Sequence, residues 1–311
     1  TLNRRVERKN MGAMQWIWKL PLASYPVLEA NDEGLAPYFV DWLAHPGYDD
    51  YWKRWAIEEN FEKIQVPAYH VGGWYDIFMG GTIRNYVGLR ARGGNEAARR
   101  GQRLIVGPWY HGPFDGRAGE VDFGPEARGG GAVFDTDDLM LRWYDYALKG
   151  IENGMEREKP VKIFVMGENR WREEDDWPLA RARSTRYYLH SDGNANSLVG
   201  DGTLSTSPPQ TEPTDYFVYN PTEPVPTRGG PLCCDNERLA SGAFDQRPIE
   251  SRGDVLVFTT EEFKEDVEVN GPVTLELYAG SSAVDTDFTA KLVDVWPNGF
   301  AQNLTEGILR A

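Results

Sequence analysis

The sequence predicts an α/β part preceded by a helical segment and followed by an all-β sandwich. From Val66 to His111 a strand, a helix and a second strand follow one another with short loops, which is the pattern of a right-handed parallel crossover. From Pro160 onward, short segments of alternating polarity are separated by turn residues, which indicates antiparallel sheets of jelly-roll type. We therefore expect three regions: a helical lid over residues 1–60, an α/β part over 61–155, and a jelly-roll β-sandwich over 156–311.

The composition is that of a globular protein and disfavours two classes of partner. The 311 residues are 41% hydrophobic and 26% charged. A net charge of −15 disfavours binding to nucleic acid or to an anionic membrane. No apolar run reaches the ~18 residues of a membrane span. With no signal peptide visible, we expect a cytoplasmic protein, and we leave open whether it forms a homo-oligomer.

The first 60 residues contain several tryptophans and short helical patterns. Asp49 is a suitable N-cap for a helix in which Trp52, Trp55 and Ala56 share one face. Because these patterns offer few apolar faces, we expect the segment to cover another part of the protein as a lid.

The α/β part is expected to contain strands at 66–71 and 104–107 with a helix at 82–92 between them. A glycine-rich loop follows from Gly112 to Gly131. The next helix should be capped by Asp135 or Thr136 and should end at Gly150. The alternating segments beyond it lie at 161–166, 186–189, 215–219, 255–258, 273–278 and 288–295.

The two cysteines, Cys233 and Cys234, are adjacent, so they cannot link distant segments. They are either two small residues of a strand, a vicinal disulfide or a reactive thiol. No cluster of histidines and cysteines accompanies them, so we expect no metal site and no cofactor.

The four histidines differ in their predicted surroundings. His45 precedes a proline, His70 lies inside a strand and His190 ends a strand, and these positions favour structural roles. His111 instead leaves the carboxyl end of a parallel strand, where open α/β sheets place their sites.

Asp76 lies in the exit loop of the preceding strand. A carboxylate there would accept the Nδ1–H of an imidazole, fix its tautomer and stabilise the imidazolium. The alternative is an Asx-turn or a helix cap. Asp followed by His is the end of the Ser…Asp…His order, but the chain has no Gly-x-Ser-x-Gly motif to supply the serine. Gly280-Ser281-Ser282-Ala283-Val284 lacks the closing glycine, and Ser24 has no glycines beside it.

Four segments carry sequence motifs that recur in one protein family. They are Gly73-Trp74-Tyr75-Asp76, Val106-Gly107-Pro108-Trp109-Tyr110-His111, Asp245-Gln246-Arg247-Pro248 and the stretch from Ser282 to Val295. With them the chain resembles the cocaine esterase-like acyl hydrolases, a family of α/β-hydrolases that includes α-amino-acid ester hydrolases and X-prolyl dipeptidyl aminopeptidases. The resemblance runs from about His45 to the last residue.

The resemblance implies roles for individual residues. Asp76 and His111 would be the acid and the base of a catalytic triad. Phe78 would line the acyl pocket, Cys233 and Cys234 would lie at the rim of the cleft, and Trp109 is a further expected substrate-binding residue. In this family the serine and a tyrosine oxyanion donor belong to an N-terminal core segment, which this chain lacks. The chain would begin inside the lid and end before its sandwich is complete.

We therefore expect a serine esterase for small-molecule esters, of which this chain carries only Asp and His and is inactive alone. An X-Pro dipeptidyl aminopeptidase is the alternative, and acidic lid residues such as Asp49 or Asp50 would then be candidates to bind the substrate amine. An alternative of another class is a non-catalytic jelly roll that binds carbohydrate.

Overall fold

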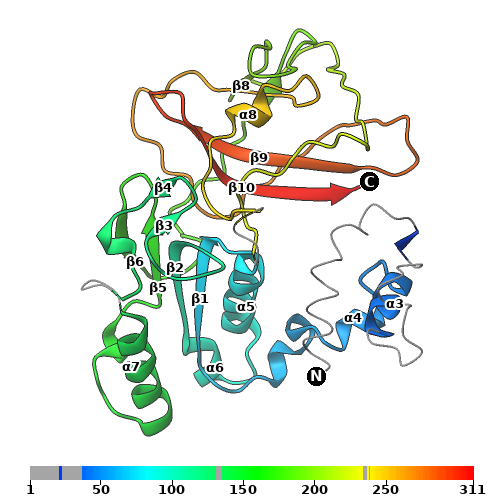
Figure 1. The fold of residues 1–311 in the computed structure, drawn as a ribbon. Helices are drawn as coiled ribbons and strands as arrows, with labels where there is room; N and C mark the ends of the chain where they lie inside the picture. Colours follow the sequence, from blue (N-terminus) through cyan, green and yellow to red (C-terminus); the bar gives the residue numbers. More distant parts are fainter. Residues whose placement is uncertain (1–20, 23–36, 131–134, 234–236, 238) are drawn as a thin grey trace. The chain divides into compact units, whose positions relative to one another are not determined.

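A computed structural model gives the fold for residues 21–22, 37–130, 135–233, 237 and 239–311 (Figure 1). The chain divides into two units, Thr1–Asn60 and Phe61–Ala311. The described residues of the first unit form α3 (Pro37–Ala44) and α4 (Asp50–Lys53). The kinked 3-10 helix η3 (Ile57–Lys63) follows. Asp49 caps α4 as expected, because its carboxylate accepts the Tyr51 N–H at 2.9 Å.

The second unit contains a four-stranded sheet with the order β1-β2-β5-β6. Strands β1 (Ala68–Tyr75), β2 (Gln102–Tyr110) and β5 (Val161–Val165) are parallel, and β6 (Arg170–Glu174) is antiparallel to β5. The predicted parallel crossover is therefore present. Strand β2 has neighbours on both edges and its residues 104–109 are all buried, which explains its unbroken apolar run.

Helices cover both faces of this sheet. The crossover helix is α5 (Met79–Arg92), followed by the short α6 (Glu96–Arg100). In β1 the ring of Tyr69 packs on Trp143 of α7 (Thr136–Lys149), and the ring of the next residue, His70, packs on Tyr86 of α5. Successive residues of a strand point to opposite faces, so α5 and α7 lie on opposite sides of the sheet. Helix α7 has the expected ends, with Asp135 as its N-cap and a left-handed Gly150 at its end.

Strand β5 differs from the expectation. The alternating segment 161–166 was predicted to open the β-sandwich, but Val161–Val165 pairs with β2 and extends the α/β sheet. Alternating polarity indicates a strand, but it does not indicate which strand will pair with it. Ile163 and Val161 pack with Leu104 and Val106 in one apolar cluster, so burial favours this pairing.

The remaining elements are mostly β. Two-stranded antiparallel sheets join β3 (Arg117–Ala118) to β4 (Val121–Asp122), β7 (Tyr188–His190) to β8 (Thr203–Ser205), and β9 (Asp287–Val295) to β10 (Ala301–Arg310). Short helices are η4 (Pro125–Ala127), η5 (Met155–Arg157) and α8 (Arg247–Glu250). The fold is thus an α/β part with a β part.

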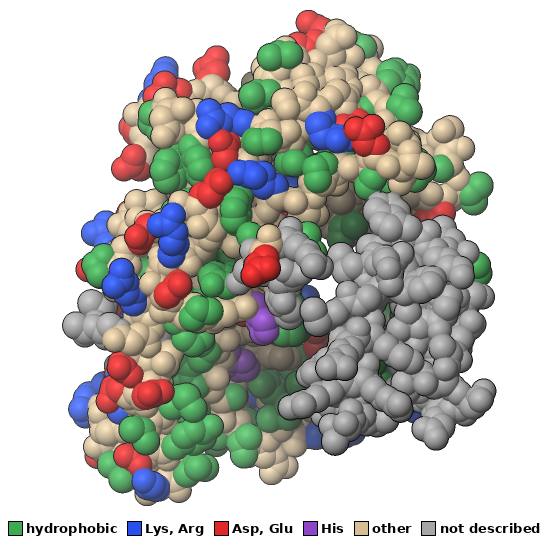
Figure 2. Space-filling model, viewed as in Figure 1, with side chains coloured by type: hydrophobic (Ala, Val, Ile, Leu, Met, Phe, Trp, Pro, Cys, Tyr) green, Lys and Arg blue, Asp and Glu red, His purple; other side chains and the backbone are tan. Residues whose placement is uncertain are grey.

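Three of the expected sandwich strands are not strands in the structure. Residues 215–219 and 273–278 form no ladder, and segment 255–258 contributes one isolated bridge, Leu256 to Asn196. The jelly roll therefore stays a prediction. Among the described residues, no helix combines the length and apolar character needed to cross a membrane. Acidic and basic side chains are interspersed on the face shown in Figure 2.

Candidate catalytic site

A shift in register at the end of β1 and β2 aligns the two expected catalytic residues. Gly73 pairs with Gly107, but the next pair is Tyr75 with Tyr110, so two steps along β1 correspond to three along β2. This irregularity contains Pro108, which has no N–H to donate to a ladder. The residues that follow the last pair are Asp76 and His111, which therefore leave the sheet side by side.

Asp76 and His111 are in contact. The distance from His111 Nδ1 to Asp76 Oδ2 is 3.3 Å, and the exposed fractions of the two side chains are 42% and 20%. The other carboxylate oxygen, Oδ1, accepts the backbone N–H of Phe78 at 2.7 Å. The Asx-turn that we considered as an alternative is thus present together with the contact to the imidazole. The turn holds Oδ1 and leaves Oδ2 facing the ring.

Phe78 lies beside this pair. Its ring meets the His111 ring edge to face, with centroids 5.1 Å apart and planes at 81°. The side chain is mostly exposed. Phe78 thus contacts His111 directly, and its expected role in the acyl pocket stays a prediction.

Trp109 does not have the position expected of a substrate-binding residue. Its side chain is only 1% exposed, its indole N–H donates to the Ala127 carbonyl at 2.6 Å, and its ring packs on Phe114. A Cβ on Gly107 would lie 2.4 Å from this indole, so the glycine provides the space for it. The register irregularity turns Trp109 into the core, where it supports the loop that follows His111.

The structure describes one of the two cysteines. Cys233 is disulfide-bonded and half-buried, which excludes a free thiol at this position. The only other cysteine in the sequence is Cys234, which lies outside the described residues. A role for either residue at the cleft rim stays a prediction.

The other three histidines each lie within hydrogen-bonding distance of another side chain. In His45, Nδ1 lies 2.6 Å from Asp49 Oδ2. In His190, Nδ1 lies 2.7 Å from Glu212 Oε1. In His70, Nε2 lies 2.8 Å from Gln102 Oε1, and burial lowers its pKa below 6.5.

The lid carboxylates also have local partners. The hydrogen bond to His45 lowers the pKa of Asp49, and Asp50 lies 3.4 Å from Lys53 Nζ. Within the part of the chain that the structure describes, no group of three or more His, Cys, Asp or Glu side chains is arranged to hold a metal ion.

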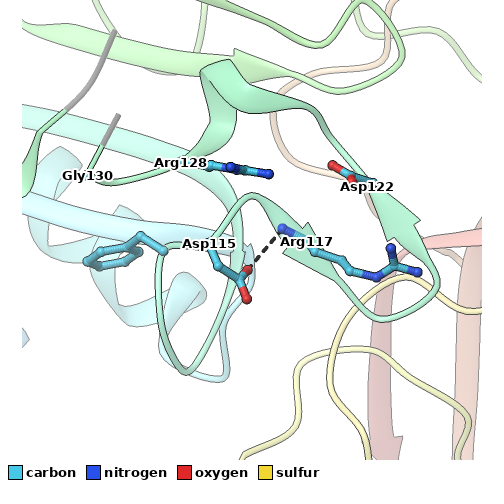
Figure 3. A pocket seen from close by; sticks show the side chains of 6 residues that line it. Asp115, Arg117, Asp122, Arg128 and Gly130 are labelled. Carbon is cyan, nitrogen blue, oxygen red and sulfur yellow. Dashed lines mark hydrogen bonds between the residues drawn. The ribbon is translucent and has the colours of Figure 1, made fainter. Parts of the chain in front are cut away.

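A hollow of about 480 Å³ lies in the loop after His111 (Figure 3). It is lined by Phe114, Asp115, Arg117, Asp122, Arg128 and Gly130. In Figure 3 these residues come from the loop around β3 and β4, and the Arg117 N–H donates to Asp115. The hollow does not include Asp76 or His111, and its lining is charged and mostly exposed. It is therefore not the acyl pocket that the family resemblance implies beside Phe78.

Comparisons with known proteins identify the family of this chain. Residues 4–113 match the family model of X-Pro dipeptidyl-peptidase (S15 family), and residues 153–311 match that of the X-Pro dipeptidyl-peptidase C-terminal non-catalytic domain. The chain therefore belongs to the cocaine esterase-like and X-Pro dipeptidyl-peptidase family of α/β-hydrolases.

Individual relatives show how much of such a protein this chain represents. It is 40% identical over 291 residues to cocaine esterase from Rhodococcus sp. (strain MB1 Bresler), which covers 93% of this chain and 48% of that protein. An aminopeptidase structure from a Thaumarchaeota archaeon has a TM-score of 0.70 at 26% identity over 91% of this chain and 46% of its own. An α-amino acid ester hydrolase structure also has a TM-score of 0.70, at 24% identity over 92% and 48%. The chain thus spans about half the length of the relatives it matches.

Sequence reasoning predicted that Asp76 and His111 would lie close together, but it missed the residues that hold them. Tyr75, directly before Asp76, is hydrogen-bonded to β10, far along the chain. The available signal was Asp245-Gln246-Arg247-Pro248, a polar motif within the predicted sandwich to which no role was given.

Proposed function

We propose that this chain carries the acid and the base of a serine acyl hydrolase, and that its reaction is the cleavage of carboxylic esters. The single observation that carries the proposal is the 3.3 Å contact between His111 Nδ1 and Asp76 Oδ2 at the carboxyl ends of two parallel strands. The family membership supports the same assignment.

In this proposal His111 Nδ1–H donates to Asp76, which leaves Nε2 to accept the proton of a serine hydroxyl. The serine attacks the ester carbonyl, and His111 then returns the proton to the leaving alcohol. A water molecule then attacks the acyl-serine, with His111 again acting as the base, and the carboxylic acid product is released. Asp76 stays ionised throughout and stabilises the imidazolium.

We further propose that a segment outside these 311 residues supplies the serine and the oxyanion donors. The sequence has no Gly-x-Ser-x-Gly motif. In addition, β1 is an edge strand of the described sheet, and the side chain of its Val71 is exposed to solvent. Parallel strands are usually buried between neighbours, so further strands alongside β1 would complete an α/β-hydrolase sheet. We propose likewise that the C-terminal region is part of a larger jelly roll.

The assignment is tested by replacing the acid in the protein extended by its nucleophile-bearing segment. Asp76→Asn should lower kcat for an aryl ester by about 10⁴-fold with little change in KM, because the amide cannot hold the correct tautomer. His111→Gln should be at least as severe. The matched control is His190→Gln, a hydrogen-bonded histidine of β7, which should retain full turnover. Near-normal turnover in Asp76→Asn would remove the assignment.

A second candidate is an exopeptidase that releases X-Pro dipeptides, which is favoured by the two family models that this chain matches. The same residues would then act on an amide, and the substrate amine would need an anionic partner. Turnover of an X-Pro anilide above that of the aryl ester would favour this candidate over the esterase.

A further inference from the structure

The residue before the proposed acid is anchored to a distant part of the chain. Tyr75 is only 1% exposed, and its hydroxyl donates to the backbone carbonyl of Asn303 at 3.0 Å. The same hydroxyl accepts from Gln302 Nε2 at 2.9 Å. Gln302 and Asn303 belong to β10, which lies beside the carboxyl end of β1 (Figure 1). The end of β1 is thus fixed by the β part of the molecule.

Asn303 is in turn held by a segment that we name the clamp, residues 242–246. Asn303 Oδ1 accepts the Phe244 N–H at 2.7 Å, and Asn303 Nδ2 donates to the Gly242 carbonyl at 3.2 Å. Gln246 donates through Nε2 to the carbonyls of Phe244 and Arg228. Gln246, Gln302 and Asn303 are all buried. Buried and hydrogen-bonded amides of this kind fix one arrangement of the backbone.

The clamp also holds the loop that leaves His111. The Ala243 N–H donates to the Ala118 carbonyl at 3.2 Å, and the Glu120 N–H donates to the Ala243 carbonyl at 2.8 Å. Glu120 Oε2 accepts the Asp245 N–H at 2.9 Å. The approach is close, because a Cβ on Gly242 would lie 2.5 Å from the Ala118 carbonyl carbon. One short segment therefore holds both Asn303, which contacts the strand that ends at Asp76, and the loop that begins at His111.

We infer that the clamp, acting through Asn303, Gln302 and Tyr75, positions Asp76 against His111. Tyr75 and Gln302 are positioning residues, because neither touches the reacting groups. This gives the Asp245-Gln246 motif a role in the site. The inference rests on the proposed function, since it assumes that the contact between Asp76 and His111 is the working one.

The test reads the tautomer of His111 in this chain by ¹⁵N NMR of its ring at mildly alkaline pH, with wild type, Tyr75→Phe and Gln302→Met. In wild type the proton should reside on Nδ1, because Asp76 accepts it. Tyr75→Phe removes the hydroxyl and leaves Gln302 without its acceptor. Asp76 should then lose its fixed position, and the His111 signals should move toward the average of both tautomers. Gln302→Met keeps the bond to the Asn303 carbonyl and should give a smaller shift in the same direction.

The matched control is Tyr86→Phe. This variant also removes a hydrogen-bonded hydroxyl from a fully buried tyrosine, on α5, where the partner is Asp176 at 3.3 Å. It should leave His111 unchanged. The ring signals of His70 report whether each variant keeps the folded sheet, because His70 packs on Tyr86 and bonds to Gln102.

Each outcome decides a different question. A wild-type His111 without the Nδ1–H tautomer would contradict the proposed function itself. A wild type with that tautomer, together with unchanged signals in both variants, would overturn only the clamp. If Tyr75→Phe and Gln302→Met both lose the folded His70 signal while Tyr86→Phe keeps it, the contacts serve overall stability and the positioning role is overturned. Shifts confined to His111 support it.

Discussion

At the scale of single residues, His70 within β1 and His111 just after β2 show how a partner decides a role. His70 is paired with the neutral amide of Gln102 and is largely enclosed, so burial lowers its pKa. His111 is more exposed and faces a carboxylate, which can stabilise an imidazolium. An amide carries no charge, so it stabilises an imidazolium less than a carboxylate does. The pairing thus separates a structural histidine from the proposed base.

His70 should make the fold sensitive to acid. Its pKa is lowered in the folded state from the usual 6.5, so below that pH the unfolded chain binds a proton that the folded chain does not. Stability is therefore fully present above 6.5 and falls as the pH drops below it. The free energy of urea unfolding, measured about one pH unit above and below 6.5, should decrease less on acidification in His70→Gln than in wild type.

Wild type is the reference for that measurement. All other titrating groups are common to the two proteins, so the difference between them isolates His70. Equal losses of stability in wild type and His70→Gln would show that His70 takes no part in the acid response.

At the scale of elements, the register irregularity between β1 and β2 is what makes a site from two strand ends. It requires close approach of the strands. A Cβ on Gly73 would lie 2.3 Å from the Trp109 carbonyl oxygen, which is backbone and cannot rotate away. Glycine is needed here for space between the strands.

Gly73→Ala should therefore push the ends of β1 and β2 apart and destabilise the protein by about 1–3 kcal/mol, the usual cost of overpacking. Gly81→Ala is the matched control, because nothing lies within 4 Å of its added Cβ in α5 and alanine favours helix. It should raise stability by up to about 1 kcal/mol. Urea unfolding measures both. If the two variants were equally stable, the close approach at Gly73 would not matter.

Prediction from sequence succeeded where the local pattern carries the information. The positions of Asp76 and His111 follow from strand ends, and the ends of α7 follow from Asp135 and Gly150. It failed where the answer depends on distant partners. Alternation predicted Val161–Val165 as a strand but did not indicate its pairing with β2. The direction of the Trp109 side chain depends on the register irregularity, which the sequence pattern does not reveal. The contact of Tyr75 with Asn303 joins residues whose proximity no local pattern predicts.

At the scale of the whole molecule, polar contacts join the α/β sheet of the second unit to its β part, some of them buried and some exposed. Besides Tyr75, Arg172 of β6 forms a two-point ion pair with Glu268 at 2.6 and 2.7 Å, and Arg181 pairs with Glu174 of the same strand. Hydrogen bonds from Arg181 hold the pKa of Glu174 below its usual range. A change that destabilises one of these two parts should therefore also destabilise the other.

The proposed division of the catalytic residues gives a prediction at this scale. This chain alone should not be labelled by a serine-directed phosphonate, because none of its serines lies in a nucleophile motif. Adding the nucleophile-bearing segment should give labelling, seen as a mass increase on one serine of the added segment. The control is the same mixture with Asp76→Asn, which should label far more slowly. Rapid labelling of this chain by itself would contradict the division.

The extra residue of β2 also has a consequence for how such sequences can diverge. The number of residues between Gly107 and His111 matters, because removing one position would bring Gly112, which has no side chain, to the place of the imidazole. A family that conserves this reaction should therefore tolerate substitutions in these positions more readily than a gap. Past His111, where the chain leaves the sheet, changes in length no longer alter which side chain faces Asp76.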